Sequence, residues 1–322
     1  MPTRRTVLQL GGALALSGAG PGWAQDGATE QLLFTVGQAA GGSADIAARV
    51  VGLSMSARTR FRVTVENRTG AGTLLAAQRV ANATPDGNTL FLVTASFITS
   101  AILNKNLTFD AFGSLKAVAH ISQIPYCIAI SPKIGVTTLP ALIQLLKANP
   151  EKYSYGTAGV GTQAHFAGEL FKILTGTRMQ AIPYSGIAPA MTDLIRGEVP
   201  IMITDFLSVM SRLNSQEVKV LAVTGTERSK RAPDVPTFIE QGVRGIDIGA
   251  WGGLMVAAAT PVEKIRERNA AVNVALADPE VQQKIDVVGG RVVGGTPESF
   301  QAFFDKEREL YQKIASEAKI SI

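Results

Sequence analysis

The sequence predicts an α/β protein with two lobes, each a mostly parallel sheet flanked by helices, and with two crossover segments between them. First, strand-like runs alternate with helical patterns over most of the chain, and this alternation is typical of parallel sheets. Second, a glycine-rich turn between a strand and a helix occurs twice, at residues 41–45 and 159–163. Third, a chain of 322 residues with 46% hydrophobic content is long enough for two cores.

The strands and helices follow from the periodicity of the apolar residues. Ile46, Val50 and Leu53 recur at helical spacing after the first glycine turn. Strands are expected at residues 32–36, 61–66, 89–93, 117–130, 153–155, 179–184, 199–204, 218–223 and 246–256. Helices are expected after residue 45, at 75–83, 138–149, 166–174, 187–196 and around 238–239, and in three C-terminal segments that begin near Pro261, Pro279 and Pro297.

The C-terminal helices carry the clearest start signals. Residues 260–263, Thr-Pro-Val-Glu, form a capping box with proline at the first helical position. Asp278 and Thr296 precede prolines in the same way. We expect the last helix, at about 298–315, to bury three phenylalanines, at positions 300, 303 and 304.

The chain is expected to pass between the lobes twice, near residues 124–130 and 246–251. Residues 27–127 together with 250–322 would form the first lobe, and residues 128–249 the second. Two crossings make a hinge, and a cleft between two lobes is a favoured place for a small-molecule site.

Residues 1–24 have the pattern of a cleaved export signal. Arg4 and Arg5 form a charged start, residues 7–19 are apolar, and Gly22-Trp23-Ala24 is a small-x-small cleavage site. The paired arginines also resemble a twin-arginine signal. We therefore expect a periplasmic protein whose mature chain begins near Gln25.

Composition excludes several classes of partner. The formal charge of +5 falls to +3 when Arg4 and Arg5 are subtracted, and no lysine- and arginine-rich stripe occurs, so nucleic-acid binding is not expected. No later run reaches the length of a membrane span. The single cysteine, Cys127, cannot form an intramolecular disulfide and is expected to be buried in a strand.

The glycine turns suggest an anion site that needs no lysine or arginine. Glycine permits a tight turn and a close approach of ligand to backbone, and the unpaired N–H groups at a helix start carry partial positive charge. The alternative for residues 41–45 is an ordinary turn with Ser43 as the N-cap and Asp45 in the first helical turn. The second copy at 159–163 favours the ligand-binding interpretation.

No catalytic residue, cofactor or metal is expected. Gly159, Gly161 and Ala164 fit the dinucleotide fingerprint, but residues 180–184 lack the carboxylate that it requires. The chain has two histidines, His120 and His165, and no cluster at metal-ligand spacing.

Three side chains keep two interpretations each. His165 either donates to a ligand or packs behind the site. Asp205 either faces a ligand, because it follows a strand at its carboxyl end, or caps a turn. Trp251 either lines the cleft or packs at the hinge.

Seven segments, taken together in this order, resemble the Bug-type substrate-binding proteins of tripartite tricarboxylate transporters. The similarity extends over nearly the whole chain after the export signal. The segments are 41–49 (GGSADIAAR), 65–72 (VENRTGAG), 85–90 (PDGNTL), 159–169 (GVGTQAHFAGE), 183–186 (PYSG), 233–237 (PDVPT) and 277–281 (ADPEV).

The resemblance implies a monomeric periplasmic Venus-flytrap protein that delivers a small organic carboxylate to the permease subunits in the membrane. It also implies that the loops 41–44 and 157–163 hold the ligand carboxylate through backbone N–H groups and ordered waters, and that Asp205 faces the other end of the ligand. The ligand-binding residues expected here are Gln38, Gly41, Gly42, Ser43, Ala44, Thr157, Gly161, Thr162, Gln163, His165, Tyr184 and Asp205.

Two features depart from the family pattern, one in the loop at residues 36–42 and one at Ser185. The family usually has Val-Pro-aromatic-x-Pro-Gly-Gly before the first helix, whereas residues 36–42 are Val-Gly-Gln-Ala-Ala-Gly-Gly. Gln38 therefore offers an amide where a ring would pack over the ligand, and the loop is expected to be more flexible. Ser185 stands where a lysine is common.

Two other functions remain as alternatives. A ligand-sensing periplasmic protein that signals to a membrane receptor would have the same features. A periplasmic enzyme would have to use Asp205, His165 and Thr162.

Overall fold

The computed structural model describes residues 29–213 and 215–321. The expected export signal and its cleavage site lie outside these residues. The strands are β1 (Glu30–Val36), β2 (Phe61–Asn67), β3 (Thr89–Thr94), β4 (Leu115–Ile130), β5 (Ser154–Thr157), β6 (Gln180–Pro183), β7 (Ile201–Asp205), β8 (Lys219–Val223), β9 (Gly249–Ala257) and β10 (Arg291–Val292). The helices are α1 (Ser43–Arg58), η1 (Ala71–Thr73), α2 (Leu74–Ala81), α3 (Ala95–Leu103), η2 (Pro132–Ile134), α4 (Leu139–Ala148), α5 (Gln163–Thr175), α6 (Ile187–Arg196), α7 (Leu207–Met210), α8 (Val262–Leu276), α9 (Pro279–Val287) and α10 (Pro297–Glu317).

The strands join in the order β2-β1-β3-β9-β4-β7-β5-β6, with β8 and β10 also paired to β4. Strands that lead into helices pair in parallel, β1 with β2 and β3, and β5 with β6 and β7. The pairs that involve β4 or β9 are antiparallel. The α/β class is therefore confirmed. The expectation of mostly parallel sheets holds for the outer strands only, because β4 and β9 run in opposite directions.

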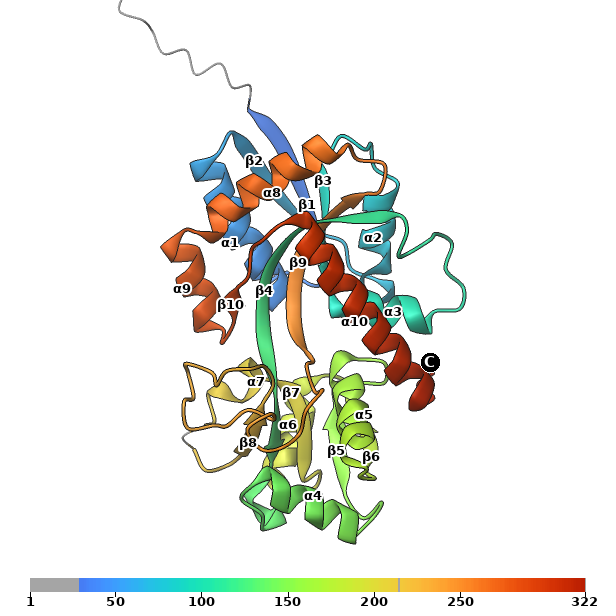
Figure 1. The fold of residues 1–322 in the computed structure, drawn as a ribbon, viewed down its shortest axis with the longest axis vertical. Coiled ribbons are helices and arrows are strands. Elements are labelled where there is room, and N and C mark those ends of the chain that lie inside the picture. Colours follow the sequence, from blue (N-terminus) through green and yellow to red (C-terminus); the bar gives the residue numbers. More distant parts are fainter. Residues whose placement is uncertain (1–28, 214, 322) are drawn as a thin grey trace, which may run out of the picture.

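Strand β4 belongs to two parts of the sheet. Its residues from Leu115 to Pro125 pair with β9, and those from Tyr126 to Ile130 pair with β7. In Figure 1, β4 and β9 run side by side between an upper and a lower set of elements. We call β1–β3, β10, α1–α3 and α8–α10 the first group, and β5–β8 with α4–α7 the second group.

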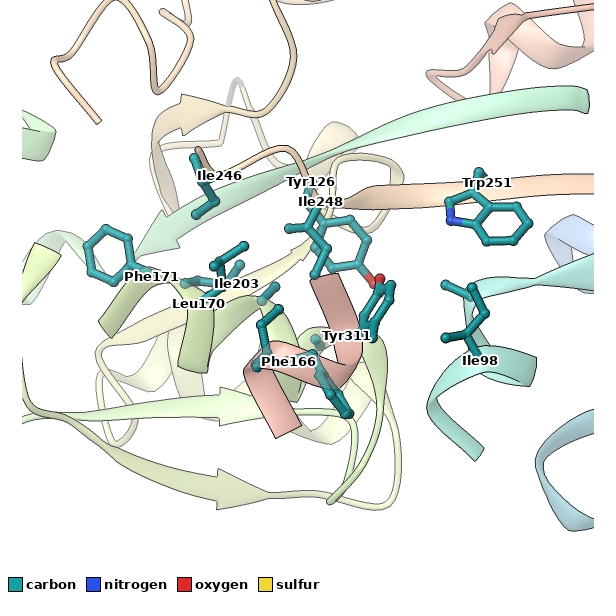
Figure 2. Packing of buried hydrophobic residues seen from close by; sticks show 14 of the residues in the cluster. Ile98, Tyr126, Phe166, Leu170, Phe171, Ile203, Ile246, Ile248, Trp251 and Tyr311 are labelled. Carbon is teal, nitrogen blue, oxygen red and sulfur yellow. The ribbon is translucent and has the colours of Figure 1, made fainter. Parts of the chain in front are cut away.

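The core consists of large buried clusters on the sheet faces. Cys127 is a free, buried thiol in β4, as expected. Phe300 and Phe304 of α10 are buried as expected, and Phe303 is half-buried. Figure 2 shows α10 residue Tyr311 between Phe166 of α5 and Tyr126 of β4. Helix α10 therefore contributes to the packing of both groups.

Helix α1 does not bury the apolar residues whose spacing predicted the helix. Ile46 and Leu53 are 41% and 68% exposed, whereas Ala48 and Val51 are buried. The helix packs through its small residues because it lies very close to β2. A Cβ on Gly52 would be 2.8 Å from Cγ1 of Val63.

Other local expectations were met in part. Thr138, Asp278 and Thr296 cap α4, α9 and α10 through their side chains. Helix α8 instead has Pro261 as its N-cap and no side-chain cap, so the predicted capping box at 260–263 is wrong.

Residues around 238–239 form a turn and not a helix. Helix α3 was not predicted, because its mainly apolar sequence gives no amphipathic signal. No helix in the described ranges is both long and apolar enough to cross a membrane.

Candidate functional site

The carboxyl ends of the parallel strands bring the expected residues together within each group. In the first group, Val36 of β1 is in register with Leu92 of β3, and Gln38 Nε2 donates to Thr94 Oγ1 at 2.8 Å. In the second group, Thr157 of β5 is in register with Pro183 of β6. Strand β7 flanks β5 on its other side and ends at Asp205. The two edges are where ligands of open parallel sheets bind.

The first loop leaves several backbone N–H groups at the start of α1 without a partner in the helix. The N-cap is Gly42, not Ser43 as one interpretation expected. The first intrahelical donor is Ile46, whose N–H donates to Gly42 O at 2.9 Å. The N–H groups of Ser43, Ala44 and Asp45 precede it, so they have no helical acceptor.

The Asp45 side chain holds this loop in shape. Its Oδ2 accepts from the Gly41 N–H at 2.9 Å, and Gly41 has φ +83°. Its carboxylate also accepts from Arg49 Nε at 3.0 Å and from Asn67 Nδ2 at 2.8 Å. Asp45 is only 2% exposed. The hydrogen bond from Arg49 is the main cause that lowers the pKa of Asp45 to about 2, against the opposing effect of burial.

The second loop repeats this geometry. Gly161 has φ +74°, and its N–H donates to Nδ1 of His165, four residues later, at 3.2 Å. Thr162 is the N-cap of α5, and its hydroxyl donates to Gly159 O at 2.7 Å. Its oxygen lies 3.1 Å from that of Thr157. The two loops therefore correspond residue by residue, from Gly41 with Gly161 to Asp45 with His165.

His165 lies behind the loop and supports it. Burial lowers the pKa of His165 below its usual value of 6.5, which favours the neutral ring that Nδ1 needs as an acceptor. Its Nε2 is 3.9 Å from Oε1 of Glu169, which also accepts from Tyr155 and Lys172. Of the two interpretations of His165, the geometry favours a supporting role.

Acidification is therefore expected to weaken ligand binding through His165. The neutral form is favoured in the folded protein, so its contribution to stability is full above the unfolded pKa of about 6.5 and is lost as pH falls through the lowered folded value. Calorimetric titrations at successively lower pH below 6.5 should show affinity falling as the ring gains a proton and Nδ1 no longer accepts from Gly161.

His165→Asn is the matched control for this prediction. The asparagine Oδ1 can accept from Gly161 as Asp45 accepts from Gly41, and it does not titrate. Its pH profile should be flatter. Equal profiles for the two proteins would contradict the role of His165.

Three further side chains of the expected set, Tyr184, Asp205 and Gln163, are engaged within the protein. The Tyr184 hydroxyl donates to Asp193 Oδ2 at 2.8 Å. Burial, with this bond, raises the pKa of Tyr184 to about 12. Asp205 accepts from the Ser208 N–H at 3.0 Å and from its hydroxyl at 2.9 Å, so it caps the turn that leads into α7. The Gln163 side-chain amide both donates and accepts hydrogen bonds, with partners in β4, β9 and α10.

Sequence reasoning missed the start of α3. Thr94 is the N-cap of this nine-residue helix and receives the hydrogen bond from Gln38. The helix start therefore lies beside the first loop. The run Thr94-Ala95-Ser96 directly after an apolar strand was the available signal, because small hydroxyl residues are common at helix starts.

A cavity of about 1020 Å³ lies beside the crossover, by which we mean the region around residues 123–126 and 248–251 where β4 and β9 connect the two groups. Its lining includes Trp251, Glu307 and the segments 123–125, 224–231 and 289–295, and none of the expected ligand-binding residues. Trp251 is 5% exposed, and its Nε1 donates to Glu307 Oε2 at 2.7 Å. Burial raises the pKa of Glu307 to about 7. Trp251 therefore packs at the crossover and also lines this cavity.

No group of three metal-ligating side chains occurs in the part of the chain that the structure describes.

Comparison with known proteins identifies the family. A model of the tripartite tricarboxylate transporter family receptor, TctC, matches residues 47–318. An Agrobacterium vitis protein, the UPF0065 protein in the TAR-I ttuE-ttuC' intergenic region, is 33% identical over 290 residues, which cover 89% of this chain and 84% of the relative.

Two solved structures from Rhodopseudomonas palustris have the same fold. Rpa4515 with adipate is 28% identical with a TM-score of 0.76, over 91% of this chain and 98% of that chain. MatC with bound malate is 26% identical with a TM-score of 0.72, over 88% and 98%. The matches confirm the resemblance seen in the sequence. The chain belongs to the TctC receptors of tripartite tricarboxylate transporters, Bug-type periplasmic binding proteins that bind a solute and do not convert it.

Proposed function

We propose that this protein captures a small organic carboxylate in a cleft between two lobes and delivers it to the permease of a tripartite tricarboxylate transporter. The observation that carries the proposal is the pair of matching helix starts at α1 and α5. Each has a glycine with positive φ, an internal acceptor four residues later, and N–H groups without helical acceptors. Such helix starts attract carboxylates.

Backbone groups, and not a cation, would hold the ligand. No lysine or arginine occurs inside either loop, and Arg49 is engaged by Asp45 and Asn67. One helix start contributes about 0.3–1 kcal/mol when exposed and up to ~2 kcal/mol when partly buried. Micromolar binding needs about 8 kcal/mol, so several charge-assisted hydrogen bonds must act together in a closed cleft. The N–H groups of Ser43, Ala44, Gln163 and Ala164 are the proposed contacts, because the hydroxyl groups of Thr157 and Thr162 already donate to Gly159 O.

The two groups of elements correspond to the proposed lobes. We assign residues 27–127 and 250–322 to the first lobe and residues 128–249 to the second. The change of partners in β4 between Pro125 and Tyr126, and the start of β9 at Gly249, support this division. The two crossing strands would form the hinge about which the lobes close on the ligand.

The first ligands to test are dicarboxylates of four to six carbons. Relatives bind adipate and malate, and the two helix starts could accept one carboxylate each if the lobes close. Waters between ligand and loop would allow chains of different length.

Titration calorimetry with adipate and malate tests the proposal, with adipamide as the uncharged control of similar shape. We expect binding of at least one acid and none of adipamide. A thermal shift should accompany it, because ligand at 100 times its dissociation constant adds about 2.7 kcal/mol of stability. Equal binding of adipamide, or no binding across a broader carboxylate library, would contradict the proposal.

The proposal includes export to the periplasm by a cleaved signal at residues 1–24. Mature protein recovered from the periplasm should begin near Gln25, as read by N-terminal sequencing. Uncleaved protein in the cytoplasm of its host would contradict this part.

A further inference from the structure

The side chain of Gln163 connects the second loop to the crossover strands. Its Nε2 donates to Gly249 O of β9 and to the Tyr311 hydroxyl of α10, the latter at 2.8 Å. Its Oε1 accepts from the Tyr126 hydroxyl of β4 at 3.3 Å. Both N–H groups of the amide are therefore used, and one side chain joins the second group to both crossover strands and to the first group.

These partners lie where β4 and β9 separate. Pro125 with Gly249 is the last pair between the two strands, and the next residue, Tyr126, pairs with Asp205 of β7. The backbones are very close here, because a Cβ on Gly249 would be 2.9 Å from Ile124 O. A rotation of one group against the other would have to change the geometry at this point.

The contacts are shielded from water. Tyr126 is 6% exposed and Tyr311 is fully buried. Burial raises the pKa of both hydroxyls well above the usual value, so both stay neutral, with Tyr126 donating to the Gln163 amide and Tyr311 accepting from it. Figure 2 shows the hydroxyl ends of the two rings pointing toward one another. Loss of the Gln163 amide would leave buried polar groups without partners, which is costly.

The backbone of the same residue belongs to the proposed ligand site. Gln163 is the first residue of α5 and directly follows the N-cap Thr162. Its N–H precedes the first intrahelical donor, Phe166, which donates to Thr162 O at 3.1 Å. One residue therefore has its N–H at the loop and its side chain at the crossover.

We propose that Gln163 is a positioning residue that couples occupancy of the second loop to the angle between the two groups. The inference rests on the proposed function, because it assumes a carboxylate at the start of α5. The Gln163 contacts stabilise the arrangement seen here, in which α10 of the first group bonds to α5 of the second. A protein that populates this arrangement less would bind its ligand more weakly, in proportion to the population lost, without losing any ligand contact.

The test compares Gln163→Leu and Tyr311→Phe with Thr175→Val. Tyr311→Phe removes one hydroxyl that bridges the groups, and Thr175→Val removes one buried hydroxyl, bonded to Phe171 O and Thr177, at the far end of α5 within the second group. Each protein is examined by calorimetry with adipate and malate, by small-angle scattering, and by amide hydrogen exchange at residues 124, 126 and 249–251.

We expect Gln163→Leu to weaken binding at least fivefold, Tyr311→Phe two- to fivefold, and Thr175→Val less than twofold. Without ligand, the first two should exchange faster at the crossover and have a larger radius of gyration, and Thr175→Val should match the unaltered protein. Unchanged affinity and exchange in folded Gln163→Leu and Tyr311→Phe would overturn the inference, as would equal effects in all three.

The ligand-free measurements separate this inference from the proposed function. If the unaltered protein binds neither acid but the two variants still loosen the crossover, the ligand assignment fails and the role of Gln163 at the crossover stands. If the acids bind and the variants change nothing, the coupling fails and the proposed function stands.

Discussion

Replacing Asp45 by alanine is expected to weaken carboxylate binding at least tenfold and to lower the free energy of unfolding by about 2 kcal/mol. The Gly41 N–H, Arg49 and Asn67 all donate to this buried carboxylate. Its removal leaves Gly41 without an acceptor and frees the loop that orients the first N–H groups of α1. Titration calorimetry and urea unfolding measure the two effects.

Two variants control this prediction. Asp45→Asn keeps an acceptor for Gly41 but loses the charge, so its effects should be intermediate. Glu280→Ala removes another first-turn acid, which is largely exposed and pairs with Lys284, and it should change stability by less than about 1 kcal/mol. Normal ligand affinity in folded Asp45→Ala would show that the internal acceptor does not shape the site.

The hydrogen bonds to the Asp45 carboxylate should also affect how the stability of the protein depends on pH below 4. The pKa of Asp45 is lowered to about 2 in the folded protein, against about 3.9 when unfolded. A lowered carboxylate pKa adds stability that is full above pH 4 and is lost as pH falls through 2. Asp45→Asn should therefore lose less stability than the unaltered protein between pH 4 and 2.

The strand–glycine–helix units could be predicted because their signals are local. Both loops have a glycine at positive φ directly before the N-cap, and the second also has a hydroxyl N-cap, Thr162. Each of these features is specified by a few neighbouring residues. The side of α1 that is buried could not be predicted from periodicity alone. Its packing depends on the close approach of Gly52 to Val63, a contact between elements.

The backbone of the candidate site was easier to predict than its side chains. Asp45 and His165 each lie four residues after the loop glycine whose N–H they accept. The sequence shows this spacing, but it does not specify the side-chain rotamers on which the two hydrogen bonds depend. Gln163 was expected to bind ligand. Its amide instead contacts residues 37, 86 and 148 positions away, and no local signal reports such contacts.

Arg268→Leu is expected to cause the largest loss of stability, about 3–5 kcal/mol. Arg268 of α8 is fully buried. Its guanidinium donates to Glu30 at the start of β1, to Glu267 and to Asn88, its Nε donates to Gly87 O, and its Cζ lies 4.9 Å from the Phe61 ring centroid. Leucine can fill part of the space but leaves these acceptors without their donor, which urea unfolding would measure.

Arg60→Leu is the matched control, because Arg60 pairs with the same two acids, Glu30 and Glu267, while its side chain is 48% exposed. It should cost less than about 1 kcal/mol, since water replaces an exposed partner. The difference between the two variants would measure how firmly the C-terminal α8 is attached to the N-terminal strands. If Arg268→Leu cost no more than Arg60→Leu, the buried guanidinium would be dispensable. The assignment of residues 250–322 to the first lobe would then depend on the apolar contacts of α8 and α10 and on polar contacts such as those of Asp278 with Ser54 and Arg58.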